Sequence, residues 1–486
     1  MRPQFRLPPP VMMSINTGAL LDIPTGKFIK GTHDQRVLLA GIGNITGLVG
    51  PGNCFKTTVM RYMILSALAK LYGTVPEIFY NSYDTEVNTQ EERARHLSHQ
   101  IPGFENINLH DEGIWQMTNR AVYSGNEWFT ELKKYLSEKA SDKKAARFET
   151  AYLDRDGVSP LKVMTPSFTD IDSLTHFMTS DVEKILDTVE LGDSAGNTMY
   201  MRQGLAKAKL LMEMPSVAAS SLNYFLFTAH IGKEISMPSA PGTPPPRKQL
   251  QHMTGGEVIK GVTNNFFYLL HNCWLINSAR PYTNQTTKAP EYPRSQGDER
   301  AGDLDLFIVT MRQLRGKNGT SGFNIELLVS QADGVLASLS EFHYVKKSNR
   351  FGLEGNDRSY SLALYPEVAM SRTTVRQKLR EDKKLARAME ITSQLCQMYE
   401  YQRDLLDTLM EPEALRKALE AKGYDWDWLF ENTRSWHTLN DEVHPLYPLS
   451  TLDLCRIARG EYHPYWLCVD NKTVKPEYAK KKRQLT

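Results

Sequence analysis

Residues 50–58 read GPGNCFKTT, and this stretch decides how the rest of the chain is interpreted. It nearly matches the phosphate-binding loop G-x-x-x-x-G-K-[ST], in which backbone N–H groups at a helix N-terminus cradle phosphates and a lysine reaches the terminal phosphates. Phe55 stands where that motif has its second glycine. The stretch is therefore either a nucleotide site of an unusual subtype or a surface loop that contains Lys-Thr.

The flanking sequence has the order that a phosphate-binding loop requires. An apolar strand is predicted over residues 45–49, and a helix with apolar residues at helical spacing follows the loop and ends near Gly73. On this basis we expect ATP and Mg²⁺ as cofactors, with a lysine on the β- and γ-phosphates and a threonine as metal ligand. The residues predicted to bind them are Gly50, Pro51, Gly52, Asn53, Cys54, Phe55, Lys56, Thr57 and Thr58.

Strands and helices alternate along the next 300 residues or so, which predicts an α/β fold with a mainly parallel, twisted sheet flanked by helices. Helices are expected over residues 127–149 and 198–214, the first of them exposed and part of an insertion near 108–160. Further strands are expected over 77–83, 168–174, 224–232, 265–276 and 304–311. Three parts are predicted: an N-terminal oligomerisation segment (1–35), an ATPase core (36–350) and a smaller helical C-terminal domain with a basic tail (351–486).

Composition excludes some classes of protein. No secretory h-region or long apolar run occurs, so we expect a cytoplasmic protein with no membrane partner. The five cysteines are odd in number and lack CxxC spacing, which argues against a disulfide framework or a zinc site. A formal charge of +2 does not decide on nucleic acid, because DNA binding needs a local basic stripe.

Two acidic motifs follow predicted strands. In FTDIDSL, Asp172 ends the strand and is the candidate that supports Mg²⁺, with Asp170 as the competing choice. In YDTE, Glu86 is the candidate base that activates water. Taken singly, each acid could be an ordinary turn or surface residue, so the order of the motifs carries the argument.

That order resembles the RecA superfamily. The stretches SINTGALLD (14–22), ELGDS (190–194) with the helix after it, and TGGEVIK (254–260) are similar to conserved elements and DNA-binding loops of these proteins. The nearest likeness is to the UvsX-type recombinases of large tailed bacteriophages, whose phosphate loop likewise resembles G-P-x-x-x-F-K-[ST]. The resemblance covers residues 14–345 and makes Phe55 a feature of a subtype.

The resemblance implies roles for several side chains. Lys56 and Thr57 would bind ATP and Mg²⁺, Asp172 would support the metal, Glu86 would activate water, and His230 would sense the γ-phosphate. In RecA-like filaments the nucleotide lies between protomers, and basic residues of the neighbour complete the site. The candidates for this role are Arg312, Arg315 and Lys317. The alternatives are a polar histidine that merely ends a strand and a hairpin with solvated charges.

Single-stranded DNA is held by phosphate contacts and by side chains wedged between bases. The candidates in the two loops are Arg202, Lys207, Met237, Arg247, Lys248, Gly255, Gly256 and Lys260. A plain flexible linker is the alternative for the proline-rich second loop.

The sequence thus predicts an ATP-dependent homologous recombinase and DNA-dependent ATPase. It would form helical homo-oligomeric filaments on single-stranded DNA, pair them with homologous duplex DNA, and work with single-strand-binding and loader proteins in an infected bacterial cell. One alternative is a hexameric RecA-core helicase, against which stands the short stretch of 30 to 40 residues before the loop region. The other is a nucleotide-binding filament protein that does not hydrolyse ATP.

Overall fold

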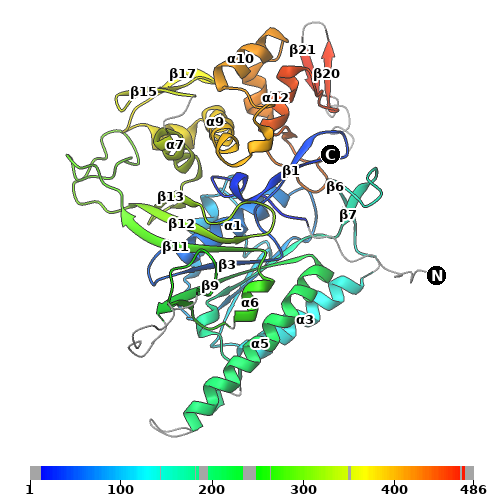
Figure 1. Cartoon of the computed structure of the whole chain (residues 1–486), viewed down its shortest axis with the longest axis vertical. Coiled ribbons are helices and arrows are strands. Elements are labelled where there is room, and N and C mark those ends of the chain that lie inside the picture. The colour runs from blue at the N-terminus through cyan, green and yellow to red at the C-terminus, as the bar shows by residue number, and fades with distance from the viewer. Residues whose placement is uncertain are drawn as a thin grey trace, which may run out of the picture.

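The structure is a computed structural model that describes residues 13–142, 144–180, 182–184, 195–233, 248–262, 264–348, 352–470 and 473–476. It is an α/β fold in which a large mixed, mostly parallel sheet is flanked by helices (Figure 1). The prediction of a mostly parallel sheet between helices is confirmed at this level. Within the described residues, no helix has the length and apolarity needed to cross a membrane.

The central sheet has ten strands. In spatial order they are β14 (Gly334–Val335), β13 (Asn324–Ser330), β12 (Leu306–Gly316), β11 (Asn272–Pro281), β3 (Ile45–Gly50), β9 (Asn223–Lys233), β8 (Ser167–Asp172), β4 (Phe79–Asp84) and β5 (Trp115–Asn119), with β10 (Glu257–Ile259) paired to β9. The strands from β11 to β5 are parallel to one another. Strands β12, β13, β14 and β10 pair antiparallel.

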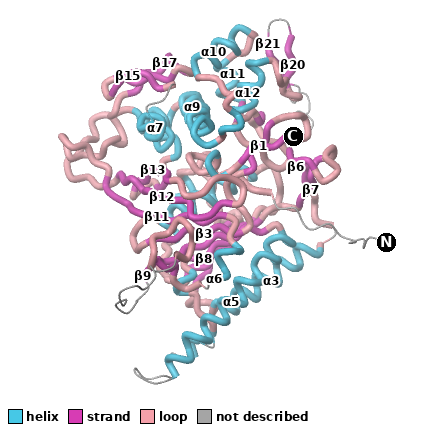
Figure 2. The backbone as a smooth tube through the Cα atoms, in the orientation of Figure 1, coloured by secondary structure: helices cyan, strands magenta, loops and turns pink. Residues whose placement is uncertain are grey.

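Strand β3 lies in the middle of the sheet and is buried on both faces, as its apolar sequence predicts. Because successive side chains point to opposite faces, Leu48 joins one core and Ile45 and Val49 join another. Helix α1 (Lys56–Leu71) packs in the first core, while α3 (Gly125–Ser141) and α5 (Ala195–Ser221) pack in the second. Figure 2 shows helices on both sides of the strand layer.

The remaining helices and strands surround this sheet. In the N-terminal and central parts they are η1 (Ile23–Thr25), β1 (Lys27–Lys30), β2 (Arg36–Leu39), α2 (Glu91–His99), β6 (Phe148–Leu153), β7 (Pro160–Val163), η2 (Leu174–His176), α6 (Asn264–Leu269) and α7 (Ala337–Ser348). After residue 351 they are β15 (Leu353–Asn356), β16 (Ser359–Leu362), β17 (Tyr365–Met370), α8 (Val375–Glu381), α9 (Lys383–Tyr401), η3 (Arg403–Leu405), α10 (Pro412–Ala421), α11 (Trp426–Asn432), β18 (Thr433–Arg434), β19 (Tyr447–Pro448), α12 (Thr451–Arg459), β20 (Leu467–Asp470) and β21 (Thr473–Pro476).

The C-terminal region is built mainly of helices, and it shares a core with the sheet. Leu306 of β12 and Leu328 of β13 lie in the same buried cluster as the apolar face of α9. The side chain of Gln402 donates hydrogen bonds of 2.9 Å to the carbonyl oxygens of Ile23 and Gly26. The region from residue 352 therefore closes over the N-terminal segment and the sheet as one continuous body.

The described part of the N-terminal segment packs on its own chain. The Tyr224 hydroxyl donates to the Met13 carbonyl at 2.6 Å, and Ile15 bridges to Ile42. The buried Asp22 carboxylate accepts hydrogen bonds from Thr17 and Gly18 and so fixes the turn between them. Residues 13–35 thus serve the core of this chain, and the prediction of an oligomerisation role for this segment stays a prediction.

Three local predictions were wrong. The helix expected over 127–149 ends at Ser141, and strand β6 begins at Phe148. Residues 265–276 were expected to form one strand but divide into α6 and β11, because an aromatic run of this length has no periodicity that separates helix from strand. The supposed insertion near 108–160 contributes β5 to the central sheet, where Trp115 is fully buried.

Candidate functional site

The candidate site lies at the edge of the sheet where the parallel strands β3, β9, β8 and β4 end. Gly50 pairs with His230, and Asp84 pairs with Asp172, so the ends of these strands are level with one another. Ligands of open α/β sheets bind at the carboxyl ends of the strands, in the crevice left by the connecting loops. Four of the predicted motifs therefore meet at one edge.

The loop between β3 and α1 forms a left-handed turn, although Phe55 stands where the usual motif has a glycine. Phe55 has a φ of 66° and Asn53 a φ of 53°, both in the left-handed region, and α1 begins at the next residue, Lys56. Asparagine tolerates this conformation, whereas phenylalanine adopts it at a cost of about 1–2 kcal/mol. The ring of Phe55 packs on Phe307 of β12, with 5.0 Å between ring centroids. This contact offsets the strain and keeps the loop at the N-terminus of α1.

Close packing explains one glycine of the loop. A Cβ on Gly50 would lie 2.8 Å from the carbonyl oxygen of Ile276, so no larger residue fits there. Gly52 meets no neighbour within 4 Å, and with Pro51 and Asn53 it forms the exposed crest of the loop. Cys54 is buried beneath this crest.

Lys56 and Thr57 open helix α1 with their polar atoms turned to the loop and to β8. The Lys56 ammonium donates a hydrogen bond to the carbonyl oxygen of Pro51 and thus folds back over the loop. The Thr57 hydroxyl donates to the Asp172 carboxylate at 2.6 Å, and Thr228 of β9 donates to its other oxygen. Thr58, one residue on, places its methyl group beside Gly334 of β14. The structure therefore brings the two predicted metal ligands, Thr57 and Asp172, into direct contact.

The alternative acid on the same strand has a different setting. Asp170 is fully buried and accepts a hydrogen bond of 3.1 Å from the Tyr80 hydroxyl. Burial raises the pKa of Asp170 to about 7, although the charge of Arg61 acts against the rise. A carboxyl group in the sheet interior does not reach the loop, so only Asp172 is placed to act with Thr57.

Asp84 organises the turn that carries Glu86, and sequence reasoning missed it. Its carboxylate accepts four backbone N–H bonds of 2.7 to 2.9 Å, from residues 86, 87, 88 and 89. Thr85, between the two acids, exchanges hydrogen bonds with the backbone of Ser173 at 2.7 and 2.9 Å. The end of β4 is thereby tied to the end of β8, and the signal in the sequence was the acid two residues before Glu86.

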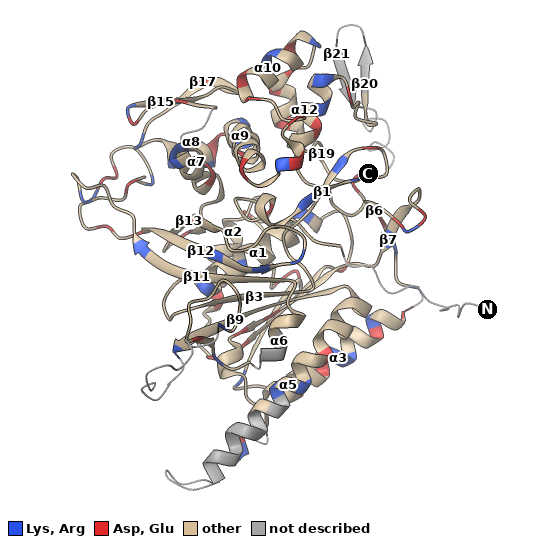
Figure 3. Cartoon of the chain, in the orientation of Figure 1, with Lys and Arg blue, Asp and Glu red and all other residues tan. Residues whose placement is uncertain are grey.

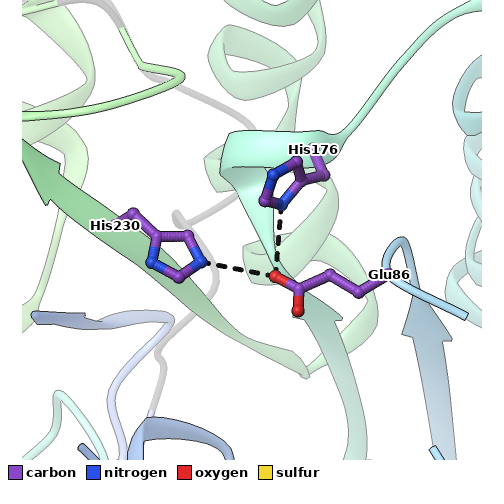
Figure 4. Close-up of side chains that lie close together, drawn as sticks. All are labelled: Glu86, His176 and His230. Carbon is purple, nitrogen blue, oxygen red and sulfur yellow. Dashed lines mark hydrogen bonds and ion pairs between the residues drawn. The ribbon is translucent and has the colours of Figure 1, made fainter. Parts of the chain in front are cut away.

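Glu86 itself meets two histidines from different elements (Figure 4). Its Oε1 atom lies 3.2 Å from Nδ1 of His176 on η2 and 3.4 Å from Nε2 of His230 on β9. The Ser173 hydroxyl donates to the same oxygen at 3.1 Å. Burial acts to raise the pKa of Glu86, but these hydrogen bonds and the histidine charges lower it overall. His176 was not predicted, although it follows Asp172 by only four residues.

His230 is also held from its backbone side. Its N–H donates to the Thr175 hydroxyl at 2.9 Å, and its carbonyl accepts from the N–H of Lys260 at 2.8 Å. Burial, followed by the charge of Lys56, lowers the pKa of His230 below its ordinary value. A neutral imidazole beside an ionised Glu86 is therefore the state favoured at neutral pH.

Two of the three predicted basic residues, Arg315 and Lys317, lie toward the edge of the sheet opposite the loop of their own chain. Arg315 on β12 pairs with Cys273, and the neighbouring Asn272 pairs with Thr46 near the start of β3. The Arg315 guanidinium donates to the carbonyl oxygen of Leu270 at 3.1 Å, while Lys317 is exposed. Arg312 lies nearer the loop edge and donates to Asn324 at 3.0 Å. Any action of Arg315 or Lys317 on a nucleotide would require a second copy of the chain.

The predicted DNA-binding residues fall into three groups. Lys248, Gly255 and Lys260 lie at the surface, and Gly256 beside them is partly exposed. Arg202 belongs to α5, whereas Met237 and Arg247 lie outside the described residues.

Lys207 differs from the other predicted DNA contacts. It is buried, and its ammonium donates to the carbonyl oxygens of Leu174 at 2.9 Å and Thr175 at 3.2 Å. In this conformation it does not present its charge to a phosphate. Figure 3 shows Lys and Arg interleaved with Asp and Glu over the described chain, so charge alone does not mark a nucleic-acid surface.

Two comparisons with known proteins add no relative to this picture: no family model and no curated protein matches the chain.

Proposed function

We propose that the chain is an ATP-dependent recombinase with a RecA-like core, which assembles on single-stranded DNA and pairs it with homologous duplex DNA. The observation that carries the proposal is the contact between Thr57 and Asp172 at the foot of a glycine-containing loop that opens α1. A hydroxyl and a carboxylate side by side, next to free helix N–H groups, form a setting for Mg²⁺ and phosphate together.

The side chains and backbone groups around the loop suit both Mg²⁺ and a polyphosphate. Oxygen atoms of Thr57 and Asp172 suit Mg²⁺, which prefers such ligands and keeps several waters. The loop N–H groups and Lys56 suit a polyphosphate, and the bond from Lys56 to the Pro51 carbonyl is one that a phosphate oxygen would replace. When bound, MgATP supplies the γ-phosphoryl group whose transfer to water is the reaction proposed.

Glu86 is the residue placed to take the proton from the attacking water. Its lowered pKa keeps the carboxylate ionised at neutral pH, and the Asp84 turn fixes its position. His230 hydrogen-bonds Glu86 on one side and, through its backbone, Lys260 at the end of the second predicted DNA loop on the other. A change at the nucleotide would therefore reach the DNA loop through one residue.

The position of the basic residues supports the proposal of a filament. Lys317 lies near the start of β3 and the phosphate loop lies at its end, so a head-to-tail contact would bring one to the other. Such heterologous contacts generate open helical filaments when they do not close. A hexameric helicase would instead close the ring, and a filament protein without turnover would not depend on Glu86.

The test is electron microscopy of the purified chain on single-stranded DNA with a slowly hydrolysed ATP analogue, together with ATP hydrolysis with and without DNA. The variants are Lys56→Ala and, as a matched control, Lys417→Ala on the exposed face of α10. We expect open filaments and DNA-stimulated hydrolysis in the wild type and the control, and neither in Lys56→Ala. Closed rings would support the helicase, and filaments without hydrolysis in the wild type would support the non-hydrolysing protein.

A further inference from the structure

The three side chains around Glu86 have a second chemical capacity. Glu86, His176 and His230 each offer one ligand atom, and these atoms lie within 4.8 Å of one another. Two imidazole nitrogens and one carboxylate oxygen form a donor set that binds Zn²⁺ and other late first-row cations. Mg²⁺ prefers oxygen ligands and near-ideal octahedral geometry, so this cluster differs in kind from the Thr57–Asp172 pair.

The distances agree with those of a small tetrahedral site. Zinc bonds of about 2.0–2.1 Å place neighbouring tetrahedral ligands about 3.3 Å apart. The two nitrogen-to-Oε1 distances here are 3.2 Å for His176 and 3.4 Å for His230. The two rings stand 5.6 Å apart at 73° to one another, so each directs one nitrogen to the carboxylate from its own side. The two histidine nitrogens lie within 4.8 Å of one another, so a small rotation of the rings allows one cation to be shared by all three donors.

The surroundings hold the donors in place and leave a path to solvent. Ser173 hydrogen-bonds both Glu86, at 3.1 Å, and His176, at 3.2 Å, and the four N–H bonds to Asp84 fix the turn that carries Glu86. The His176 side chain is 47% exposed, which allows a cation to enter and a water or phosphate oxygen to be the fourth ligand. The positive charge of Lys56 acts on His230 and opposes the binding of a cation, so the site would be of moderate affinity.

We propose that Glu86, His176 and His230 form a binding site for a divalent transition cation such as Zn²⁺ or Co²⁺. The cation takes the lone pair of the nitrogen that faces Oε1 in each neutral ring, and the single proton of that ring lies on the other nitrogen. Because the same carboxylate is the proposed base, an occupied site blocks water activation while leaving the loop free to bind nucleotide. This consequence rests on the proposed function, whereas the binding itself does not.

The binding test uses Co²⁺ added to the nucleotide-free full chain in excess Mg²⁺, with visible absorption to distinguish four-coordinate from hydrated cobalt and calorimetry for affinity. We expect a four-coordinate spectrum and a Kd on the order of micromolar, unchanged by Mg²⁺. His176→Ala should weaken binding at least about 100-fold, because loss of even an outer-shell partner costs 10- to 100-fold. The half-exposed position of His176 makes this variant compatible with folding, which the melting temperature would verify.

The control is His33→Ala, which removes an exposed histidine that stacks on Tyr465 far from the site. It should leave the cobalt spectrum unchanged. A wild-type chain that gives only the hydrated cobalt spectrum, or a His176→Ala chain that binds as well as wild type, would overturn the proposal. If cobalt binds but the wild type hydrolyses no ATP, the site stands and the recombinase fails. If ATP hydrolysis is present and insensitive to stoichiometric Zn²⁺, the inhibitory consequence fails.

Discussion

The parallel half of the central sheet (β11 to β5) and its antiparallel half (β12 to β14) place the candidate functional residues differently. In the parallel half, β3, β9, β8 and β4 all end at one edge, so residues far apart in sequence become neighbours: Thr57 bonds Asp172, and Glu86 meets His230. In the antiparallel half, β12 runs the other way and carries Arg315 and Lys317 toward the start of β3. Strand direction therefore separates Asp172 and Glu86 from Arg315 and Lys317 within one chain.

This difference in strand direction determines which of the candidate residues can act together within one chain. The parallel edge is cross-linked by short hydrogen bonds that end on Asp84, Asp172 and Glu86, all from one chain. Arg315 and Lys317 lie toward the opposite edge of the sheet in the same copy. If they act on the phosphates, they do so on those of another copy, and this can be tested by mixing variants.

Mixing Lys56→Ala with Lys317→Ala gives the largest expected effect. Each variant alone should lose DNA-stimulated hydrolysis by on the order of 10³- to 10⁵-fold, as removal of a cation that stabilises the transferred phosphoryl group does. In an equimolar mixture, about one quarter of head-to-tail interfaces would pair an intact Lys56 with an intact Lys317, and activity should return to roughly that fraction.

The measurement is steady-state ATP hydrolysis of the mixture against each variant and against wild type diluted with buffer. A mixture no more active than its components would show that Lys317 acts within its own chain or not at all. Full activity of Lys317→Ala alone would transfer the role to Arg315 or Arg312.

The next effect concerns the turn that carries Glu86. Asp84→Ala removes an acceptor for four backbone N–H groups, so we expect about 3 kcal/mol of lost stability and roughly tenfold slower turnover with little change in nucleotide affinity. Chemical denaturation and hydrolysis assays would measure both quantities. Asn88→Ala removes only the 3.1 Å bond to Glu86 and should change stability by less than about 0.5 kcal/mol. Equal losses in the two variants would show that the carboxylate does not organise the turn.

How far the sequence predicts this site depends on the range of each signal. The loop, the strands before and after it, and Asp172 and Glu86 are recognisable because residues next to one another in sequence define them. His176 and Lys207 were beyond such reasoning, since only the packing of η2 against β9 and α5 places one on Glu86 and turns the other inward onto two carbonyl groups. The choice between Asp170 and Asp172 likewise needed the end of β8, because the two residues share one face of the strand. Asp172 is the last residue of β8 and reaches Thr57, whereas Asp170 lies two residues inside the strand and is fully buried.

The burial of Asp170 predicts that the stability of the chain depends on pH. The pKa of Asp170, raised by burial from 3.8 to about 7, means that the folded chain holds a proton that the unfolded chain has lost across this interval. Stability from this group is therefore full below pH 4 and falls as the pH rises toward 7. Asp170→Asn should remove the dependence and add about 4 kcal/mol at pH 8 relative to wild type, but little at pH 4. Urea denaturation of both proteins at the two pH values would test this, and a constant difference would refute it.

The smallest effect is expected at Phe55, a loop residue whose ring packs on Phe307 of β12. Phe55→Gly removes the strain of a left-handed residue but also the ring contact, so we expect a net change of less than about 1 kcal/mol. Phe55→Ala loses the same contact and keeps the strain. It should therefore be less stable than the glycine variant by about 1 kcal/mol.

The pair of variants separates backbone from side chain at the one position where this loop departs from the usual motif. Denaturation curves give the two stabilities, and nucleotide affinity reports whether the loop keeps its shape. If Phe55→Ala is as stable as Phe55→Gly, the backbone of residue 55 is not strained in the folded loop. The second glycine of the usual motif would then have a role other than allowing the left-handed turn before α1. If Phe55→Gly is more stable than Phe55→Ala and binds nucleotide as wild type does, the left-handed turn is sufficient for nucleotide binding. The Phe55 ring then serves only to attach the loop to β12.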